Sequence, residues 1–346
     1  MKPFNQINLK ILKEMKKIMI AFALLASVFA CQKPIAVPDA QEATGLIELS
    51  IVRSDIDTKA AYTTVLDDEK AEKKVAVLVF NKATGRLEAS KDIPTSASGC
   101  TFNVKTGEKI IYAVINGPSL ANVTSEGELN TLVDDLSAGN IGTAGLTMIG
   151  KKEATVQVGT VATSVSIEVS RLVSRIVVKG ITHDLPAQYN SIRLESVFLA
   201  NAYSKSTLGG TTFDMVNING YQDAGKNQAI GKGGTQGLCS AYMFKTIGKD
   251  IIKGAQDDTP YILYAQPNDT DTYTKLMLYI SYGGDLSGYY PIILDKKLKA
   301  NTTYTVSLVL KNTPVPDPDD VFQTGSASVT ITVKDWQTGD EYTSSL

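Results

Sequence analysis

The feature that most constrains this fold is the strict alternation of apolar and polar residues in segment 326–336, SASVTITVKDW. Its apolar residues occupy every second position: Ala327, Val329, Ile331 and Val333. Successive side chains of a β-strand point to opposite faces, so this pattern in β-branched residues predicts a strand with one buried face. The preceding segment 312–320, NTPVPDPDD, is rich in proline and aspartate, and we expect an extended tether that does not join a sheet.

Similar patterns recur along the chain and predict a mainly β protein. Fifteen tyrosines, 27 glycines and many Thr, Val and Ile runs favour strands joined by turns. The expected strands are 45–53, 75–80, 109–116, 154–158, 164–169, 171–178, 191–199, 261–265, 276–282, 289–294 and 303–310. A chain of 346 residues is long enough for two domains. We place the boundary near Ser170, because a new series of strands begins there after a complete sheet–helix–sheet set.

One segment has the period of a helix rather than that of a strand. Ser125, with Glu128 three residues later, fits a capping box, which marks the first turn of a helix. The apolar residues that follow share one helical face: Leu129, Leu132, Val133 and Leu136. We expect a helix of about three turns that packs across a sheet.

The first thirty residues have the pattern of an export signal. Two lysines precede the apolar run 18–30, which has the length of a signal peptide and is too short to span a membrane. Ala30 directly precedes Cys31, as in the bacterial lipobox, where the cysteine is lipidated and becomes the mature N-terminus. In that interpretation Met15 would be the start of a signal of normal length. The alternative is an ordinary signal peptide with an incidental cysteine.

The strand 45–53 leads into a short polar loop, 54–59, which is bracketed by Arg53 and Lys59. Exposed loop tips with polar residues are preferred sites of proteolysis. Both basic residues are therefore candidate cleavage points.

Charge and composition argue against nucleic-acid binding and against catalysis. Charged residues make up 20% of the chain and the net charge is −2, without a basic block beyond the N-terminal region. The one histidine, His183, stands beside Asp184, but no nucleophile motif accompanies the pair. We expect a histidine in a surface turn, no enzyme activity and no cofactor.

Two acidic segments and two cysteines leave alternatives open. Asp257-Asp258 and 268–271 carry oxygen ligands of the kind that calcium needs, but neither matches a fixed calcium-binding pattern. We expect solvated turns there and no metal site. Cys100 and Cys239 would form a disulfide only if the fold brings them together; otherwise they are buried free thiols.

Taken in order, these segments resemble the fimbrillins of Bacteroidales, the FimA-type family of pilus subunits. The resemblance covers nearly the whole chain, and the order and spacing of the motifs carry it. The matching motifs are the lipobox ending at Cys31, LIELSIVR at 46–53, Lys59 in TKAA, VAVLVFN at 75–81, RLVSRIVV at 171–178, NTTYTVSL at 301–308 and VTITVKDW at 329–336.

The resemblance implies a mainly β fold, with two transthyretin-like β-sandwich domains in tandem and a short helix in the first. It also implies this division of the chain: a signal peptide at 1–30, a lipidated propeptide with the first strand at 31–59, an N-terminal domain at 60–170 and a C-terminal domain at 171–346. The C-terminal domain would include the tether 312–320 and a donor strand at 326–336.

The resemblance further implies a structural subunit of a surface fimbria. Cys31 would carry the lipid that anchors the precursor in the outer membrane. A trypsin-like protease would cut after Lys59, or alternatively after Arg53, and so remove the first strand. The best-known member is cut after arginine, so the lysine at 59 is a departure from the family pattern.

The partners implied are further fimbrial subunits, which would join by donor-strand exchange, and host or bacterial surface ligands in adhesion. The C-terminal strand of one subunit would enter the apolar groove of the next. The side chains expected to fill that groove are Val329, Ile331, Val333 and Trp336.

Other interpretations compete with this one. The last strand could complete its own C-terminal sandwich, either permanently or until assembly. The chain could instead be a surface glycan-binding lipoprotein beside an outer-membrane uptake system, with Tyr273, Tyr282 and Tyr289-Tyr290 as aromatic platforms. A hydrolase built on His183 and Asp184 has the least support.

Overall fold

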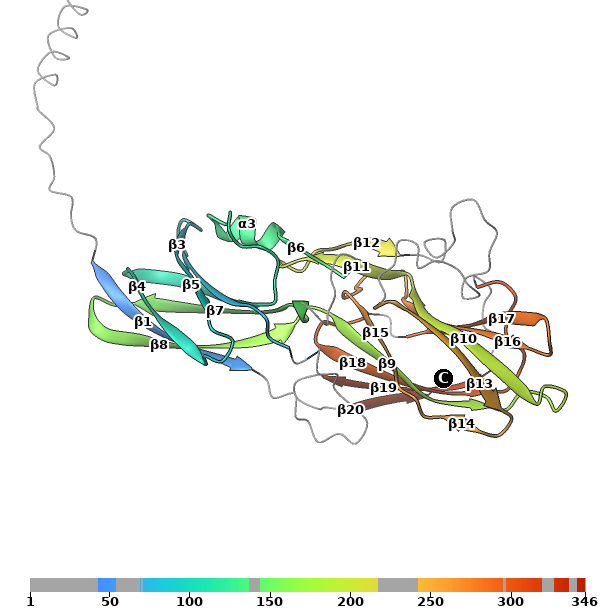
Figure 1. The fold of residues 1–346 in the computed structure, drawn as a ribbon. Helices are drawn as coiled ribbons and strands as arrows, with labels where there is room; N and C mark the ends of the chain where they lie inside the picture. The colour runs from blue at the N-terminus through green and yellow to red at the C-terminus, as the bar shows by residue number, and fades with distance from the viewer. Residues whose placement is uncertain are drawn as a thin grey trace, which may run out of the picture. The chain divides into compact units, whose positions relative to one another are not determined.

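The computed structural model describes residues 43–53, 69, 71–136, 144–216, 242–294, 297–318, 327–335 and 341–345. Nearly all regular structure in these ranges is β-strand (Figure 1), so the predicted mainly β class is confirmed. From Thr44 onward the described residues belong to one compact unit.

The first part of the chain forms a sandwich from strands hydrogen-bonded in the order β3-β2-β5-β7-β8-β1-β4. Their bounds are β1 (Thr44–Arg53), β2 (Val75–Asn81), β3 (Leu87–Ile93), β4 (Gly99–Lys105), β5 (Gly107–Ile115), β7 (Met148–Val156) and β8 (Gly159–Arg171). The long strand β8 joins the two layers, because it pairs with β7 only at its end, at Ser170 and Arg171, and with β1 along most of its length. The core between the layers combines β1, β4 and β8 with β2 and β5.

Alternation explains which side of each strand is buried in that core. On β2 and β5 both faces are covered, as the continuous apolar runs predict: Val77 and Val79 face the sandwich core, while Leu78 and Phe80 face a second cluster. The second cluster includes Leu129 of the helix α3 (Glu126–Thr131). The helix therefore packs across this sheet, as expected.

The helix is shorter than predicted. The capping box is present, since the Ser125 side chain accepts from Glu128 N and the Glu128 carboxylate accepts from Ser125 N. However, Leu132 already has an extended backbone (φ −63°, ψ 139°), and β6 (Val133–Asp135) follows. β6 pairs with β11 (Ala202–Thr207), with Val133 opposite Thr207. This long-range pairing overrides the local helical period.

The second part of the chain forms another sandwich, with an apolar core shared by two sheets. One sheet has the order β13-β10-β16-β17, and the other has the order β14-β9-β18-β19-β20 with β15 on β9. The bounds are β9 (Ser174–His183), β10 (Ser191–Ala200), β13 (Phe244–Ile252), β14 (Gln256–Asp257), β15 (Tyr261–Ala265), β16 (Lys275–Tyr282), β17 (Leu286–Ile293), β18 (Thr302–Leu310), β19 (Ala327–Asp335) and β20 (Glu341–Ser345). A smaller sheet joins β6, β11 and β12 (Thr212–Val216).

Each strand expected from the sequence overlaps an observed one, whereas several other strands were not predicted. β3, LEASKDI, and β13, FKTIGKDII, contain charged residues on their exposed positions and lack strict alternation. The division into two domains near Ser170 and the transthyretin-like topology stay predictions. β8 ends at Arg171 and β9 begins at Ser174.

Candidate functional site

The N-terminal strand β1 lies between two neighbours in the interior of its sheet (Figure 1). It runs antiparallel to β4, from Thr44 opposite Lys105 to Ser50 opposite Gly99. It runs parallel to β8, ending with Arg53 opposite Val169. Both of its hydrogen-bonding edges are therefore in use. If β1 left, β4 and β8 would each expose an unpaired edge.

The apolar side of β1 is part of the sandwich core. Ile47, Leu49 and Ile51 are 0%, 2% and 5% exposed. Burying a side chain of this size contributes about 1.5–3 kcal/mol. The same site without β1 would be a groove lined by the core residues of the neighbouring strands, including Phe102 on β4 and Ile167 on β8.

The contact between β1 and β4 is unusually close at Gly99. A Cβ atom on Gly99 would lie 1.9 Å from the carbonyl oxygen of Leu49, so only glycine fits this backbone approach. The next residue, Cys100, is opposite Leu49 and packs against the sandwich core. Its thiol is free and half-buried, and burial raises its pKa.

The C-terminal strand β19 lies between β18 and β20 in its own sandwich (Figure 1). It is antiparallel to β18, from Thr302 opposite Asp335 to Leu310 opposite Ala327. Val329 and Ile331 are 5% and 2% exposed, so the predicted alternation and buried face are confirmed. In this structure the strand completes its own sheet, which is one of the alternatives that the sequence leaves open.

The proline-rich tether is partly paired, contrary to expectation. Val315 and Tyr289 of β17 exchange backbone hydrogen bonds of 2.8 and 3.0 Å. The Tyr290 hydroxyl donates to the carbonyl of Asn312. Proline lacks an N–H group, but Val315 between two prolines keeps its own and can bridge to a strand edge.

A buried ion pair anchors Glu69, which follows the loop where cleavage is predicted. The Arg175 Nε atom lies 2.8 Å from Glu69 Oε1, and the two side chains are 1% and 0% exposed. The Tyr264 hydroxyl donates to the same carboxylate, and Arg171 Nη2 donates to the Glu69 carbonyl at 3.1 Å. Burial lowers the pKa of Arg171 to about 10 and raises that of Tyr264.

Sequence reasoning missed this cluster, although a signal was present. Arg171 and Arg175 interrupt the otherwise apolar segment RLVSRIVV. Arginine on a strand that is buried needs a charged partner. The sequence does not say which of the many carboxylates provides it.

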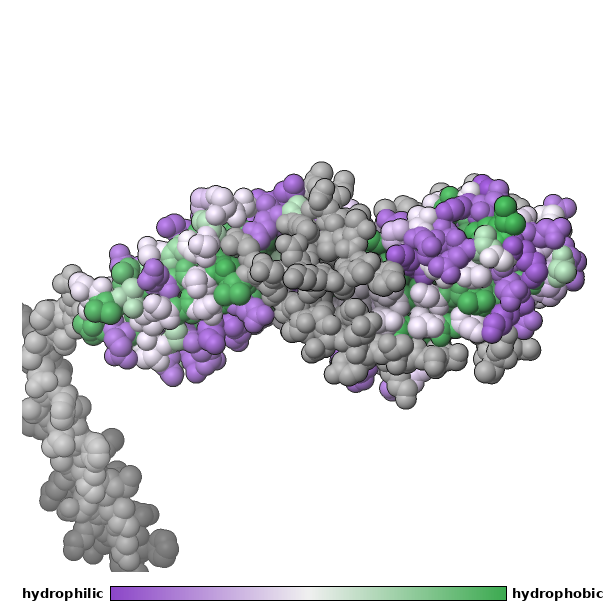
Figure 2. Space-filling view, turned by 90° about the horizontal axis from the view of Figure 1, so that it is seen from below, coloured by the Kyte–Doolittle hydropathy of each residue, from purple (hydrophilic) through white to green (hydrophobic). Residues whose placement is uncertain are grey.

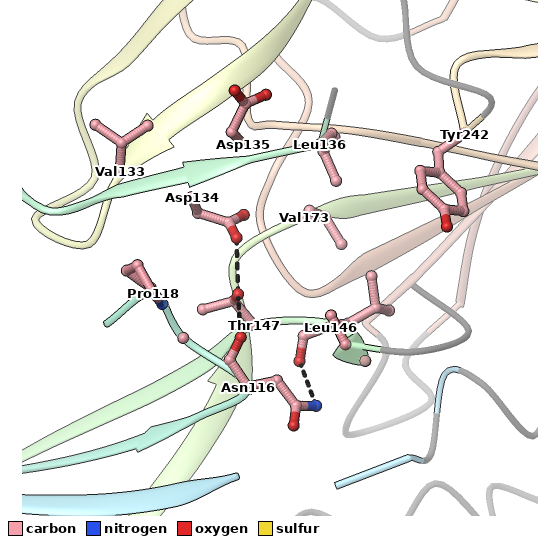
Figure 3. A pocket seen from close by; sticks show the side chains of 13 residues that line it. Asn116, Pro118, Val133, Asp134, Asp135, Leu136, Leu146, Thr147, Val173 and Tyr242 are labelled. Carbon is pink, nitrogen blue, oxygen red and sulfur yellow. Dashed lines mark hydrogen bonds between the residues drawn. The ribbon is translucent and has the colours of Figure 1, made fainter. Parts of the chain in front are cut away.

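A pocket of about 270 Å³ lies beside β6 and the end of β5 (Figure 3). Its acidic residue Asp134 accepts hydrogen bonds from Thr147 Oγ1 at 2.7 Å and from Gln266 Nε2 at 2.6 Å. Burial raises the pKa of Asp134. Asn116 Nδ2 donates to the Leu146 carbonyl at 3.1 Å. These polar groups bond to one another, so the pocket wall is a structural network that holds β6 in place.

Several predicted site residues lie outside the described ranges. These are Cys31, Lys59, Trp336 and Cys239. Arg53 is the last residue of β1, and Val333 lies on β19 opposite Tyr304, but the side chains of both fall outside the description.

The predicted surface turn at His183 is wrong. His183 ends β9 and is fully buried. Its Nδ1 atom accepts from Leu185 N at 3.2 Å, which leaves Nε2 to donate to the Tyr189 carbonyl at 2.8 Å. Burial lowers the pKa of this histidine. With both ring nitrogens engaged by backbone, His183 has a structural role.

The expected solvated turns are also wrong at two positions. Asp257 is 4% exposed and accepts from Lys249 Nζ and from the Tyr261 hydroxyl, each at 2.6 Å. Asn268 is 1% exposed and donates to Thr272 O and Thr274 Oγ1. Within the described ranges, no group of three or more His, Cys, Asp or Glu is placed to hold a metal ion.

Tyr289 and Tyr290 do not form the exposed aromatic platform that a glycan-binding protein would need. Tyr289 and Tyr290 are 5% and 0% exposed and belong to the core of the second sandwich. Tyr282 is partly buried against that core, and Tyr273 is 37% exposed. Stacking on a sugar needs an exposed ring face, so the two buried tyrosines cannot supply it.

The surface in Figure 2 shows green apolar areas interspersed with purple hydrophilic ones. The most exposed large apolar residues of the described chain are Val161, Val158 and Ile252, at 86%, 72% and 68%. Among the described residues, no helix is long and apolar enough to cross a membrane.

Comparisons with known proteins agree with this architecture. Residues 43–172 match the family described as major fimbrial subunit protein (FimA). No curated protein matches the sequence.

Solved structures from Bacteroidales share the fold. A fimbrilin from Porphyromonas gingivalis has 16% identity and a TM-score of 0.60, covering 86% of this chain and 99% of its own. A candidate cell adhesion protein from Bacteroides eggerthii has 18% identity and a TM-score of 0.62, covering 85% and 96%. Another from Parabacteroides distasonis has 18% identity and a TM-score of 0.58, covering 85% and 100%. The predicted resemblance is confirmed: residues 43–172 match the major fimbrial subunit (FimA) family, and a fimbrilin shares the fold.

Proposed function

We propose that this protein is a structural subunit of a cell-surface fimbria with a role in adhesion. The match of residues 43–172 to the fimbrial subunit family supports this proposal, as does the fold shared with a fimbrilin. The precursor is exported as a lipoprotein and held in the outer membrane by a lipid on Cys31. The sequence VFAC at 28–31 supports that anchor.

Assembly begins when a trypsin-like protease cuts after Lys59, or after Arg53. The observation that carries this proposal is the position of β1. It fills the middle of a sheet and buries three large side chains, yet it is the first described strand of the chain. One cut on the C-terminal side of β1 leaves the strand bound to the rest of the protein by non-covalent contacts alone. Its departure opens an apolar groove between β4 and β8.

The strand that fills this groove is β19 of the next subunit. Its alternating Val329, Ile331 and Val333 repeat the spacing of Ile47, Leu49 and Ile51 on β1. Strand addition restores both rows of hydrogen bonds and buries the alternate side chains. Because the contact is head-to-tail, it produces an open filament rather than a closed dimer. In the unassembled subunit β19 stays on β18.

A disulfide between β1 and β4 tests the proposal. Leu49 is opposite Cys100, and antiparallel partners have Cα atoms about 4.5–5.5 Å apart, within the range that a disulfide spans. In the variant Leu49→Cys, oxidation should join the two residues and keep β1 in place after trypsin treatment. We expect monomers from the oxidised variant and a ladder of polymers on denaturing gels after reduction.

The variant Leu49→Ala is the matched control, because it removes the same apolar side chain but cannot form the bond. It should polymerise after trypsin with or without reductant. The proposal fails if cleaved wild-type protein forms no polymers. It also fails if the oxidised Leu49→Cys variant, with its disulfide verified by mass, polymerises as readily as the control.

A further inference from the structure

A second constellation, unrelated to the strand groove, lies in the N-terminal sandwich. Lys109 of β5 and Asn81 of β2 are direct partners on neighbouring antiparallel strands. Glu88 belongs to β3, which pairs with β2 on its other side. The Lys109 side chain is fully buried and that of Glu88 is 11% exposed. Lysine is almost never fully buried unless it is paired, and here Glu88 is the partner.

One carboxylate oxygen lies between two nitrogen atoms of this group. Glu88 Oε1 accepts from Lys109 Nζ at 2.9 Å and from Asn81 Nδ2 at 3.0 Å. Lys109 also donates to the Thr106 carbonyl at 3.3 Å. The second oxygen of Glu88 is buried and has no hydrogen-bond partner among the described residues. Glu88 can therefore pass a proton between an amine and an amide, which is the position of a general acid and base.

The amide oxygen of Asn81 is held by backbone donors. Oδ1 accepts from Ala83 N at 3.0 Å and from Thr84 N at 3.1 Å. Two converging N–H groups stabilise the negative charge that develops on a carbonyl oxygen when a nucleophile attacks its carbon. The group thus contains a nucleophile, an activated carbonyl and a proton carrier.

We propose that Lys109 and Asn81 join in an intramolecular amide bond. Lys109 first transfers a proton to Glu88, and the neutral Nζ attacks Cγ of Asn81. The bond from Nζ to Cγ forms, and the bond from Cγ to Nδ2 breaks. Glu88 carries the proton of Nζ to Nδ2, which leaves as ammonia. The ammonia takes up the remaining proton as ammonium, so Glu88 ends as a carboxylate and no oxidant or co-reactant is needed.

The product ties β2 to β5 covalently in the sheet that supports the helix α3. Non-covalent strand pairs separate under a pulling force, whereas a side-chain amide does not. The inference does not depend on strand exchange, because it concerns contacts within one described sandwich.

Peptide mass spectrometry of the purified full chain tests it. Trypsin cuts after Lys74, Lys82, Lys105 and Lys151, so the linked product is peptide 75–82 joined to peptide 106–151. Its mass should equal the sum of the two peptides less one ammonia, with no cut after Lys109. Recovery of the unlinked peptides 75–82 and 106–109 from folded wild-type protein would overturn the proposal.

Two variants complete the test. Glu88→Gln keeps a side chain of the same size but cannot carry the proton, and it should give only unlinked peptides. Asn81→Asp keeps a side-chain oxygen that can accept from Ala83 N and Thr84 N. Formation of the amide bond in this variant releases water instead of ammonia, so its linked peptide should have the same mass as that of the wild type. Unlinked peptides from Asn81→Asp, or linked peptides from Glu88→Gln, would contradict the assigned roles.

Discussion

Replacing Glu69 by Gln removes the negative charge beside a buried arginine. Arg175 is 1% exposed and lies 2.8 Å from the Glu69 carboxylate. Removing one partner of a buried pair costs about 3–5 kcal/mol, because the remaining charge is left without compensation. We therefore expect Glu69→Gln to lower the free energy of unfolding by about that amount. Urea unfolding followed by circular dichroism measures it.

An exposed ion pair of the same length provides the control. Lys82 Nζ lies 2.7 Å from Glu153 Oε2, but the two side chains are 36% and 53% exposed. A pair of this kind contributes about 0–1 kcal/mol, so Glu153→Gln should change little. Adding Arg175→Met to Glu69→Gln should recover part of the loss, because the buried charge is then gone. Equal losses for Glu69→Gln and Glu153→Gln would refute the argument that burial decides the effect.

Two further changes probe β1 and the buried histidine. Gly99→Ala would place a Cβ atom 1.9 Å from the Leu49 carbonyl oxygen, so the amide hydrogens of β1 should exchange faster. The control Gly127→Ala has no contact nearer than 3.9 Å and should not show this effect. Unchanged exchange in Gly99→Ala would contradict the close approach of the two strands. Burial lowers the pKa of His183 below its ordinary value of 6.5. As the pH falls, the histidine of the unfolded chain therefore takes up a proton at a higher pH than that of the folded chain. Its contribution to stability is present above that unfolded pKa and is lost as the pH falls from about 6.5 to the folded pKa, with a slope of at most about 1.4 kcal/mol per pH unit. His183→Gln should flatten this part of the stability curve in urea titrations at successive pH values, and an unchanged slope would count against it.

Much of the fold could be predicted because strand signals are local. The alternation in 326–336 and the double-sided apolar run at 75–80 predict both the strands and their buried faces, and the structure confirms them. The capping box at Ser125 also predicts the start of α3. The end of that helix was not predictable in the same way, because β6 pairs with β11, far along the chain.

The residues whose roles were misjudged depend on distant partners. His183 and Asp257 look like surface residues in their local sequence. In the fold, His183 lies opposite Leu310 of β18, and Asp257 accepts hydrogen bonds from Lys249 of β13 and Tyr261 of β15. The glycan-binding alternative needs Tyr289 and Tyr290 to be exposed, but both are buried in the core of the second sandwich.

The amino-acid sequence by itself determined the mainly β class, the places of most strands and the resemblance to fimbrial subunits. These properties depend on residues close together in the chain, where the period of side chains sets the local structure. Only the tertiary structure decided that β1 sits between β4 and β8, that β19 rests on β18, and that Glu69 meets Arg175. Such contacts join segments separated by tens of residues or more, and their formation depends on how whole sheets pack rather than on any local pattern.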